Sequence, residues 1–502
     1  MNQIIVDVGI SENRLALVED EELVELYIER QNNRRMVGNI YKGRIANVLP
    51  GMQAAFVDIG LEKNCFLYIK DALKQDLFNK DETYYKDIPI TDVVKQGQEI
   101  TVQVIKEPLG TKGARVTTNI TLPGRYLVLM PHTSYIGVSR RIVCSEERER
   151  LREAIEQLRP HNMGIIVRTV AEGKNGEDFD EDIKFLLKLW QKIERERKIN
   201  PAPKLIHRDF DLISKTIRDT FSKDIDKFVI NNAKEYKNAL ELVELLSPSL
   251  KSRISYFDED IEIFNYYKIE SQINKSLNRK IWLKSGGYIV IDSTEAFTII
   301  DVNTGKYVGS IGLEDTVLNT NLEAADEIAK QLRLRDIGGI IIIDFIDMVD
   351  EEDNQKVIDA LEKALSKDKT RSKVLGMTQL GLVEMTRKKV RLGLDRLLQK
   401  KCQYCGGSGR LANEYTLLYK FEKEMIRISM HTNAEAVIFE TNPTVLQVFK
   451  EEKSMLEKID AETDLKSFII PNIHLHHNEI QVKAMGDMES IKKLIDKNEV
   501  IL

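Results

Sequence analysis

Four consecutive isoleucines, Ile340 to Ile343, constrain the fold of this chain more than any other feature, because they run directly into Asp344. A continuous run of branched apolar residues is typical of a strand that is buried on both faces of a sheet. Gly338-Gly339 ends the helical pattern that comes before it. A carboxylate at the exit of such a strand is costly unless a cationic group meets it. The run therefore predicts a central strand with a charged end.

A second strand with a polar end precedes the isoleucine run. Residues 288–292 and 297–303 are predicted to form two strands joined as a hairpin. Because side chains alternate along a strand, one face of the second strand is expected to carry Phe297, Ile299, Asp301 and Asn303. A helix is predicted over residues 321–335, from apolar residues at helical spacing. This order places one strand on each side of the helix in the chain.

The two strands can bring carboxylates together. If they are neighbours in one sheet, Asp301, Asn303 and Asp344 converge at a single rim. Mg²⁺ commonly uses one or two carboxylates together with substrate phosphate oxygens, so a metal site for phosphoryl chemistry is one interpretation. The other interpretation is that both aspartates cap strand ends or pair with arginine.

Composition places the chain among globular proteins. Its 502 residues suggest about three domains, and 42% hydrophobic and 31% charged residues are ordinary for a packed protein. No apolar run approaches the ~18 residues of a membrane-spanning helix, so no membrane-spanning segment is expected. Residues 1–7 show no basic region followed by an apolar core, and four cysteines cannot form a dense disulfide framework. We therefore expect a cytoplasmic protein.

Charge is distributed unevenly along the chain. The net charge is −6, which argues against a protein that coats nucleic acid indiscriminately. Residues 367–401 nevertheless contain eleven Lys or Arg against three Asp or Glu. This segment could hold a polyanion while the rest of the surface repels it. A solvated helix face is the alternative interpretation.

Residues 38–118 contain five short β-type segments separated by Gly and Pro, which predicts a small barrel of the OB type. Phe56 and Phe66 lie in apolar strands of this barrel. From the pattern alone, each is more typical of barrel core than of a binding surface.

A C-x-x-C motif, Cys402 to Cys405, lies beyond the basic segment. Two thiolates supply half of the ligands of a tetrahedral zinc ion. A redox dithiol is the competing interpretation, which the glycine-rich turn after Cys405 disfavours because a helix would be expected there. His474, His476 and His477 are possible metal ligands, but alternation favours the ordinary polar edge of a terminal strand.

At the level of whole segments, the sequence resembles the RNase E/G family of endoribonucleases, and its length is closer to that of the RNase G branch. The catalytic core of the family is matched by residues 300–303, 319–329, 333–339 and 343–348. The resemblance extends over essentially the whole chain, through the 38–118 barrel and residues 126–131, 139–141 and 402–409.

The resemblance implies a multidomain protein of α/β and α+β class. The implied parts are a split RNase H-like subdomain (1–36 and 215–278), an inserted S1-type OB-fold RNA-binding domain (37–118), a 5′ sensor region (119–214), a DNase I-like catalytic domain (279–400), a zinc link (401–412) and a small C-terminal domain (413–502).

The resemblance also implies catalytic and RNA-binding residues. Asp301 and Asp344 would ligate Mg²⁺, and Asn303 would hydrogen-bond the scissile phosphate or orient the attacking water. Phe56, Phe66 and Lys112 match barrel positions that contact RNA beside the cut. Aromatic faces stack on any base, which suits an enzyme with loose sequence preference.

Two further sites follow from the resemblance. The pocket for a 5′-monophosphate would be formed by Gly124, Val128, Arg141, Arg168, Thr169 and Arg371. Without the resemblance, Arg168 would be interpreted as a surface ion-pair partner. Cys402 and Cys405 would bind a structural Zn²⁺ shared with a second chain, which predicts a homodimer that could pair into a tetramer. Gln403 stands where the family usually has proline, which could loosen the turn without removing a ligand.

The expected function is Mg²⁺-dependent hydrolysis of single-stranded, AU-rich RNA to 5′-phosphate and 3′-hydroxyl ends, with preference for 5′-monophosphorylated substrates, in RNA processing and decay. The alternative is a non-catalytic RNA-binding protein that uses the same barrel and basic strip. A DNA nuclease is a weaker rival, which the 2′-hydroxyl of RNA would distinguish.

Overall fold

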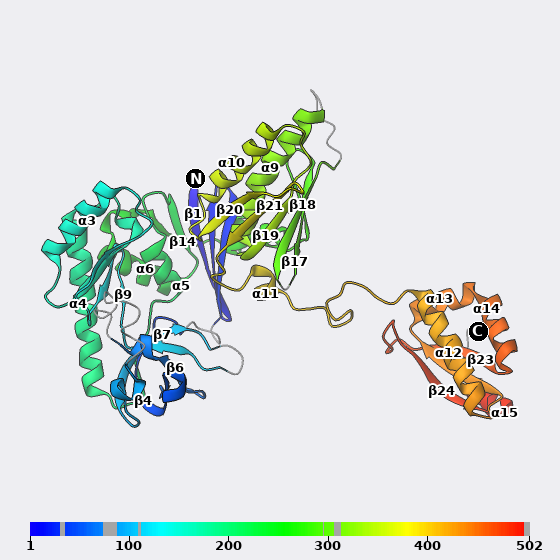
Figure 1. Cartoon of the computed structure of the whole chain (residues 1–502). Coiled ribbons are helices and arrows are strands. Elements are labelled where there is room, and N and C mark those ends of the chain that lie inside the picture. The colour runs from blue at the N-terminus through cyan, green and yellow to red at the C-terminus, as the bar shows by residue number, and fades with distance from the viewer. Residues whose placement is uncertain (31–35, 74–87, 109–111, 295, 306–312, 496–502) are drawn as a thin grey trace. The chain divides into compact units, whose positions relative to one another are not determined.

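A computed structural model describes residues 1–30, 36–73, 88–108, 112–294, 296–305 and 313–495. The chain divides into two compact units, Met1–Leu394 and Asp395–Leu502, and both mix helices with sheets (Figure 1). The short helix α11 (Leu394–Leu398) spans the boundary between the two units in the sequence. Within the described ranges, no helix is both long enough and apolar enough to cross a membrane.

Strands from two distant segments form the first sheet. Its order is β15-β14-β1-β2-β3, with β1 (Asn2–Val8), β2 (Glu12–Glu19), β3 (Glu22–Arg30), β14 (Lys227–Ile230) and β15 (Ile254–Tyr256). β1 to β3 are antiparallel, whereas β14 and β15 continue parallel to β1. The associated helices are α5 (Leu212–Asp219), α6 (Ala233–Leu246), η6 (Pro248–Arg253), α7 (Ile263–Tyr266) and α8 (Ile269–Ser276).

A closed barrel is inserted between β3 and β14. Its strands are β4 (Ile40–Leu49), β5 (Ala54–Asp58), β6 (Cys65–Tyr68), β7 (Glu99–Lys106) and β8 (Arg115–Thr117), and pairing of β4 with β7 closes it. This confirms the predicted OB-like barrel. β13 (Lys204–His207) adds to the edge of β4. Short helices η2 (Pro50–Met52), α1 (Ile69–Ala72) and α2 (Ile90–Val93) complete this part.

A four-stranded sheet follows the barrel, in the order β11-β12-β10-β9. It consists of β9 (Leu122–Pro123), β10 (Leu127–Met130), β11 (Ile136–Val138) and β12 (Gly164–Val167). Helices α3 (Ser145–Leu158) and α4 (Gly176–Ile199) supply Leu151, Ile155 and Phe179 to its core. The turn η5 (Thr169–Ala171) connects β12 to α4.

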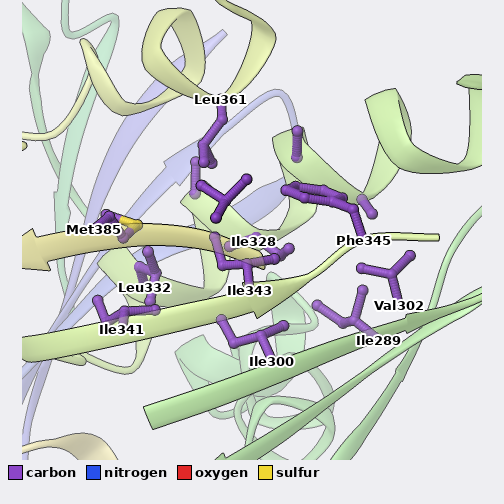
Figure 2. Packing of buried hydrophobic residues seen from close by; sticks show 14 of the residues in the cluster. Ile289, Ile300, Val302, Ile328, Leu332, Ile341, Ile343, Phe345, Leu361 and Met385 are labelled. Atoms are coloured by element: carbon purple, nitrogen blue, oxygen red, sulfur yellow. The ribbon is translucent and has the colours of Figure 1, made fainter. Parts of the chain in front are cut away.

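The six-stranded sheet that carries the candidate site has the order β16-β17-β18-β19-β21-β20. Its strands are β16 (Lys280–Trp282), β17 (Tyr288–Ser293), β18 (Phe297–Asn303), β19 (Gly339–Asp344), β20 (Ser372–Met377) and β21 (Leu382–Arg387). Helices α9 (Leu313–Leu334) and α10 (Glu351–Leu365) pack on one face. Figure 2 shows Ile328, Leu332 and Leu361 of these helices against Ile300, Ile341 and Ile343 of the sheet.

The other face of this sheet is open, which corrects one prediction. Ile341 and Ile343 are fully buried, but Ile340 is 52% exposed and Ile342 is only partly buried. The isoleucine strand is therefore not buried on both faces, because within the described ranges α9 and α10 cover only the face with Ile341 and Ile343. Alternation in β18 is as predicted, since Thr298, Ile300 and Val302 are buried and the opposite set is exposed or half-buried.

The second unit is a three-stranded sheet covered by helices. The sheet order is β23-β22-β24, with β22 (Ala436–Thr441), β23 (Lys466–Pro471) and β24 (Ile480–Gly486). The helices are α12 (Glu414–His431), α13 (Pro443–Glu451), α14 (Lys453–Thr463) and α15 (Met488–Ile495). Phe421, Phe439 and Phe449 meet in its core, with ring centroids 4.8 and 5.5 Å apart.

Candidate active site

Asp301 and Asp344 lie side by side on neighbouring strands. β18 and β19 run parallel, and Asp301 is the register partner of Asp344. Partners in register project from the same face, and neighbouring strands are about 4.8 Å apart. Both side chains are exposed on the open face of the sheet. The structure thus brings together two aspartates that are far apart in the sequence.

Asn303 contacts this pair directly. Its Nδ2 donates a hydrogen bond of 2.8 Å to Oδ2 of Asp301. The two residues are separated by one position on β18, so their side chains share a face. The second N–H and the carbonyl oxygen of the Asn303 amide can therefore bind another partner.

Negative charge gathers around Asp344. Partial burial raises the pKa of Asp344, and the charges of Asp301 and Asp347 raise it further. A bound cation would relieve this repulsion. In the part of the chain that the structure describes, no group of three or more His, Cys, Asp or Glu side chains could hold a metal by itself. The donor set is therefore a carboxylate pair, which fits Mg²⁺ when substrate oxygens complete the coordination.

Phe56 and Phe66 lie outside the barrel core. They are register partners on β5 and β6, and their ring centroids are 6.2 Å apart in an edge-to-face arrangement. Both are half-buried, whereas Ala55 and Val57 beside Phe56 are fully buried. Lys112 is exposed shortly before β8. The interpretation of these two phenylalanines as core is wrong, and their contact with RNA stays a prediction.

Arg168 contacts two residues that are distant in sequence, Gly124 and Asp219. Its Nη1 donates to the carbonyl of Gly124 at 2.5 Å, and its Nη2 forms an ion pair of 2.7 Å with Asp219. The neighbouring Thr169 has its hydroxyl 3.0 Å from that of Ser139. Arg168 is thus an ion-pair partner, as its residue type alone suggested, and it also contacts Gly124 of the predicted phosphate pocket.

A buried carboxylate shapes the loop between Gly124 and Val128. Asp182 of α4 accepts hydrogen bonds from the backbone N–H groups of residues 125–127 at 2.8 to 3.0 Å. Burial raises the pKa of Asp182, although these N–H groups act in the opposite direction. A Cβ at Gly124 would lie 2.5 Å from the Asp182 carboxylate, so a larger residue would displace the carboxylate from its three N–H donors. Val128 is half-buried on β10.

The two outer arginines of the predicted phosphate pocket lie beside the loop before β20. Nη2 of Arg141 donates to the carbonyl of Lys369 at 2.7 Å, and Nζ of Lys369 lies 3.4 Å from the hydroxyl of Thr220. Arg371 is exposed on the same loop. A cavity of about 490 Å³ lies here, and its lining includes Tyr126, Val170, Asp219 and Lys369.

The basic segment is only partly available to a ligand. Arg387 is 3% exposed and binds Asp336 at 2.9 Å and Asp368 at 2.7 Å. Arg391 also pairs with Asp336 at 2.7 Å. These arginines stabilise the fold rather than attract a polyanion. The exposed cations between residues 367 and 389 are Lys367, Lys369, Arg371, Lys373, Lys388 and Lys389.

The C-x-x-C motif forms a tight turn in which the pKa of one thiol, that of Cys405, is lowered. The backbone N–H of Gly409 donates to Sγ of Cys405 at 3.3 Å. Hydrogen bonds from Gly409 and Gly407 lower the pKa of Cys405, and the thiol of Cys402 adds to this effect. Thiolates are the form that binds metals. The next helix begins only at Glu414, so the motif lacks the helix of a redox dithiol.

The sequence did not predict the contacts that attach this turn to the rest of the second unit, which are made by Tyr404. The ring of Tyr404 lies 4.3 Å from that of His476, the Tyr404 carbonyl contacts the His476 ring, and the Tyr404 hydroxyl accepts from the N–H of His477 at 3.1 Å. These histidines lie in the loop between β23 and β24, so the prediction of a terminal strand is wrong. The only available signal was the cluster of His474, His476 and His477 itself.

Comparison with known proteins identifies relatives over most of the chain. The model of the Ribonuclease E/G family matches residues 121–390. Ribonuclease G of Salmonella typhimurium (strain SL1344) is 42% identical over 455 residues, which are 90% of this chain and 93% of that protein. Ribonuclease G of Haemophilus influenzae is also 42% identical, over 90% of this chain and 92% of the relative. Ribonuclease E of Escherichia coli (strain K12) is 36% identical over 97% of this chain, but over only 46% of its own length.

Proposed function

Because the chain belongs to the Ribonuclease E/G family and is an endoribonuclease of RNA processing, we propose that it cleaves single-stranded RNA at the Asp301–Asp344 pair. We propose Mg²⁺ as the cofactor and 5′-phosphate and 3′-hydroxyl ends as the products. The observation that carries the proposal is the register of the two aspartates on β18 and β19, which places both carboxylates on one open face.

Asp301 and Asp344 would hold the metal, and Asn303 would act beside them. A bound Mg²⁺ lowers the pKa of a water molecule and neutralises charge on the phosphate oxygens. Asn303 already donates to Asp301, which fixes the orientation of its amide. Its remaining N–H or carbonyl oxygen is then positioned to bind the scissile phosphate or the attacking water. Because Asp301, Ile340 and Asp344 are exposed among the residues that the structure describes, an extended RNA strand can approach the pair from this face.

Asn substitutions at the two aspartates test this assignment. Asp301→Asn and Asp344→Asn should each reduce cleavage of a 5′-labelled, AU-rich RNA by at least about a hundredfold, since loss of a direct metal ligand should cost no less than loss of an outer-shell partner. RNA affinity should be retained. Asp292→Asn is a matched control, since Asp292 lies on the same hairpin and pairs with Arg279 instead. Cleavage that survives in either variant, or without Mg²⁺, contradicts the proposed site.

The same assay separates the proposal from its rivals. A non-catalytic RNA-binding protein would show no Mg²⁺-dependent cleavage even when unmodified. A DNA nuclease would cut single-stranded DNA of the same sequence as fast as the RNA, whereas we expect DNA to be the poorer substrate because it lacks the 2′-hydroxyl. The ends can be identified directly, because only a 5′-phosphate product is a substrate for ligation without prior phosphorylation.

We also propose that substrates with a 5′-monophosphate are preferred. A terminal monophosphate carries more charge than an internal linkage, and an arginine fork suits it. The contact of Arg168 with Gly124, next to Thr169, supports a pocket at this position. Unmodified protein should cleave 5′-monophosphorylated RNA faster than 5′-hydroxyl RNA, and Arg168→Ala should abolish the difference. Equal rates in the unmodified protein contradict the preference.

The remaining proposals concern assembly and domain identity. We assign the split sheet of β1–β3, β14 and β15 to an RNase H-like subdomain, residues 37–118 to an S1-type domain with Phe56, Phe66 and Lys112 as RNA contacts, residues 119–214 to the 5′ sensor, and residues 279–400 to a DNase I-like domain. Cys402 and Cys405 would share one Zn²⁺ with a second chain and form a homodimer. We propose a cytoplasmic location, which is supported by the finding that none of the four cysteines forms a disulfide.

A further inference from the structure

An aromatic pair and a lysine lie together on the sheet that carries Asp301 and Asp344. Trp282 of β16 and Tyr288 of β17 are register partners, and their rings meet edge to face with centroids 5.4 Å apart. Nζ of Lys280 lies 4.0 Å from the ring centroid of Trp282 and 3.4 Å from that of Tyr288. Trp282 is 61% exposed. Such exposure leaves a large ring surface available to a ligand. It also forgoes the stabilisation that burial of this apolar surface would give.

The register of the strands aligns this cluster with the candidate active site. Two cross-strand rows connect them: Trp282, Tyr288, Asn303; and Lys280, Val290, Asp301, Asp344. Partners in register share a face, so the rings and the ammonium lie on the same open face as the carboxylates. One strand separates β16 from β18, which places the cluster roughly 9–10 Å from Asp301.

We propose that Trp282, Tyr288 and Lys280 bind a nucleotide of single-stranded RNA next to the scissile linkage. The proposal rests on the proposed function, because it takes the Asp301–Asp344 pair as the site of cleavage. RNA matches the cluster in both of its properties, since bases stack on exposed aromatic rings and phosphates pair with lysine. Trp282 stacks on the base, and Lys280 contacts a phosphate of the same strand. Stacking accepts any base, so this site adds affinity without sequence preference.

Tryptophan fluorescence reports on this contact directly. The chain has two tryptophans, and the other, Trp190 of α4, is only 7% exposed and lies in a hydrophobic core. Titration of the full-length protein with a ten-nucleotide oligoadenylate, without Mg²⁺, should quench the emission of Trp282. Trp282→Phe should remove the quenching and keep the affinity within about threefold, because phenylalanine can still stack.

Affinity measurements with labelled RNA test the energetic role. Trp282→Ala should raise the Kd for the oligonucleotide about tenfold. Lys280→Gln should raise it about threefold and reduce the slope of log K against log salt by ~0.7, the value for one phosphate contact on a single strand. Tyr266→Ala is the matched control, because Tyr266 at the end of α7 is 51% exposed and contacts the rings of Phe257 and Tyr267, away from this cluster. It should leave the Kd unchanged.

Abasic RNA locates the base that stacks. In a substrate with one abasic position, the loss of affinity at the stacked position should occur with unmodified protein and disappear with Trp282→Ala.

If RNA binds and is cleaved but Trp282→Ala changes neither Kd nor quenching, the nucleotide site is wrong and the proposed function stands. If Trp282→Ala instead lowers the molecular mass in solution without changing the Kd, the face is an interface between copies of this chain, which also overturns the inference. Failure to bind RNA at all contradicts both proposals.

Discussion

Asp219, the last residue of α5, connects this helix to Arg168 of the predicted phosphate pocket. It forms one ion pair with Arg168 at 2.7 Å and another with Arg218 at 2.8 Å. Burial raises the pKa of Asp219, but the hydrogen bonds and charges of Arg218 and Arg168 outweigh it, so the net pKa lies below its usual value. The carboxylate thus stabilises the folded state whenever it is ionised.

This ion pair predicts a pH-dependent loss of stability. Asp219→Asn should reduce the free energy of unfolding at pH 7 by about 1.5–3 kcal/mol, the range for hydrogen bonds to charged groups. A carboxyl whose pKa is lowered in the folded state contributes stability above its unfolded pKa and loses it as the pH falls through its folded pKa. The difference between the two proteins should therefore shrink as the pH falls below about 4.

Urea unfolding at pH 7, 5, 4 and 3 measures this difference. Asp260→Asn, which changes an exposed carboxylate, should alter the free energy of unfolding by less than about 0.5 kcal/mol at each pH. A cost of Asp219→Asn that is independent of pH would show that the carboxylate contributes through shape and not through its charge.

At the scale of elements, a sheet with one covered face both positions the site and leaves it accessible. β19 contributes Ile341 and Ile343 to the core, while Ile340, Ile342 and Asp344 lie on the open face. A parallel neighbour in register is what places Asp301 beside Asp344. The same face carries the Trp282 cluster, so ligand contacts and catalysis would use one surface.

The two faces of β19 predict opposite responses to truncation. Ile341→Ala and Ile343→Ala should each reduce the free energy of unfolding by about 2–5 kcal/mol, because both side chains are fully buried. Ile340→Ala should cost less than about 1 kcal/mol, because the side chain is 52% exposed. Chemical denaturation of the three variants measures the contrast. Similar costs at all three positions would mean that the open face is covered in solution.

Alternation in β18 predicted correctly which side chains share a face, because a period of two is a local property of the chain. The isoleucine run predicted a strand correctly but misjudged its burial, since a pattern of apolar residues does not tell whether a second layer covers them. The partners of Arg168 could not be predicted, because Asp219 is distant in sequence and reaches it only through the fold. The same holds for Tyr404 and His476, which a loop brings together.

At the scale of the whole molecule, the chain consists of two units with separate cores. The first contains the split sheet, the barrel, the four-stranded sheet and the six-stranded sheet that carries the candidate site. The second buries its own apolar residues between α12, α13, α14 and its three strands. The C-x-x-C turn belongs to the second unit, where Tyr404 attaches it to the loop that contains His476. A metal bound at this turn would therefore be attached to the folded core of the second unit, and a metal shared by two chains would join their second units.

A shared zinc ion predicts a specific stoichiometry and mass. One chain offers two cysteines at this turn, and tetrahedral zinc needs four ligands, so metal analysis should find about half a zinc per chain. The mass in solution should be at least about twice the 57.7 kDa of one chain. Chelation, or Cys402→Ser with Cys405→Ser, should remove the zinc and lower the mass, measured by light scattering after gel filtration. Cys144→Ser, which changes an exposed cysteine outside the motif, should change neither value. A full zinc per chain, or a dimer that persists without zinc, contradicts the shared site.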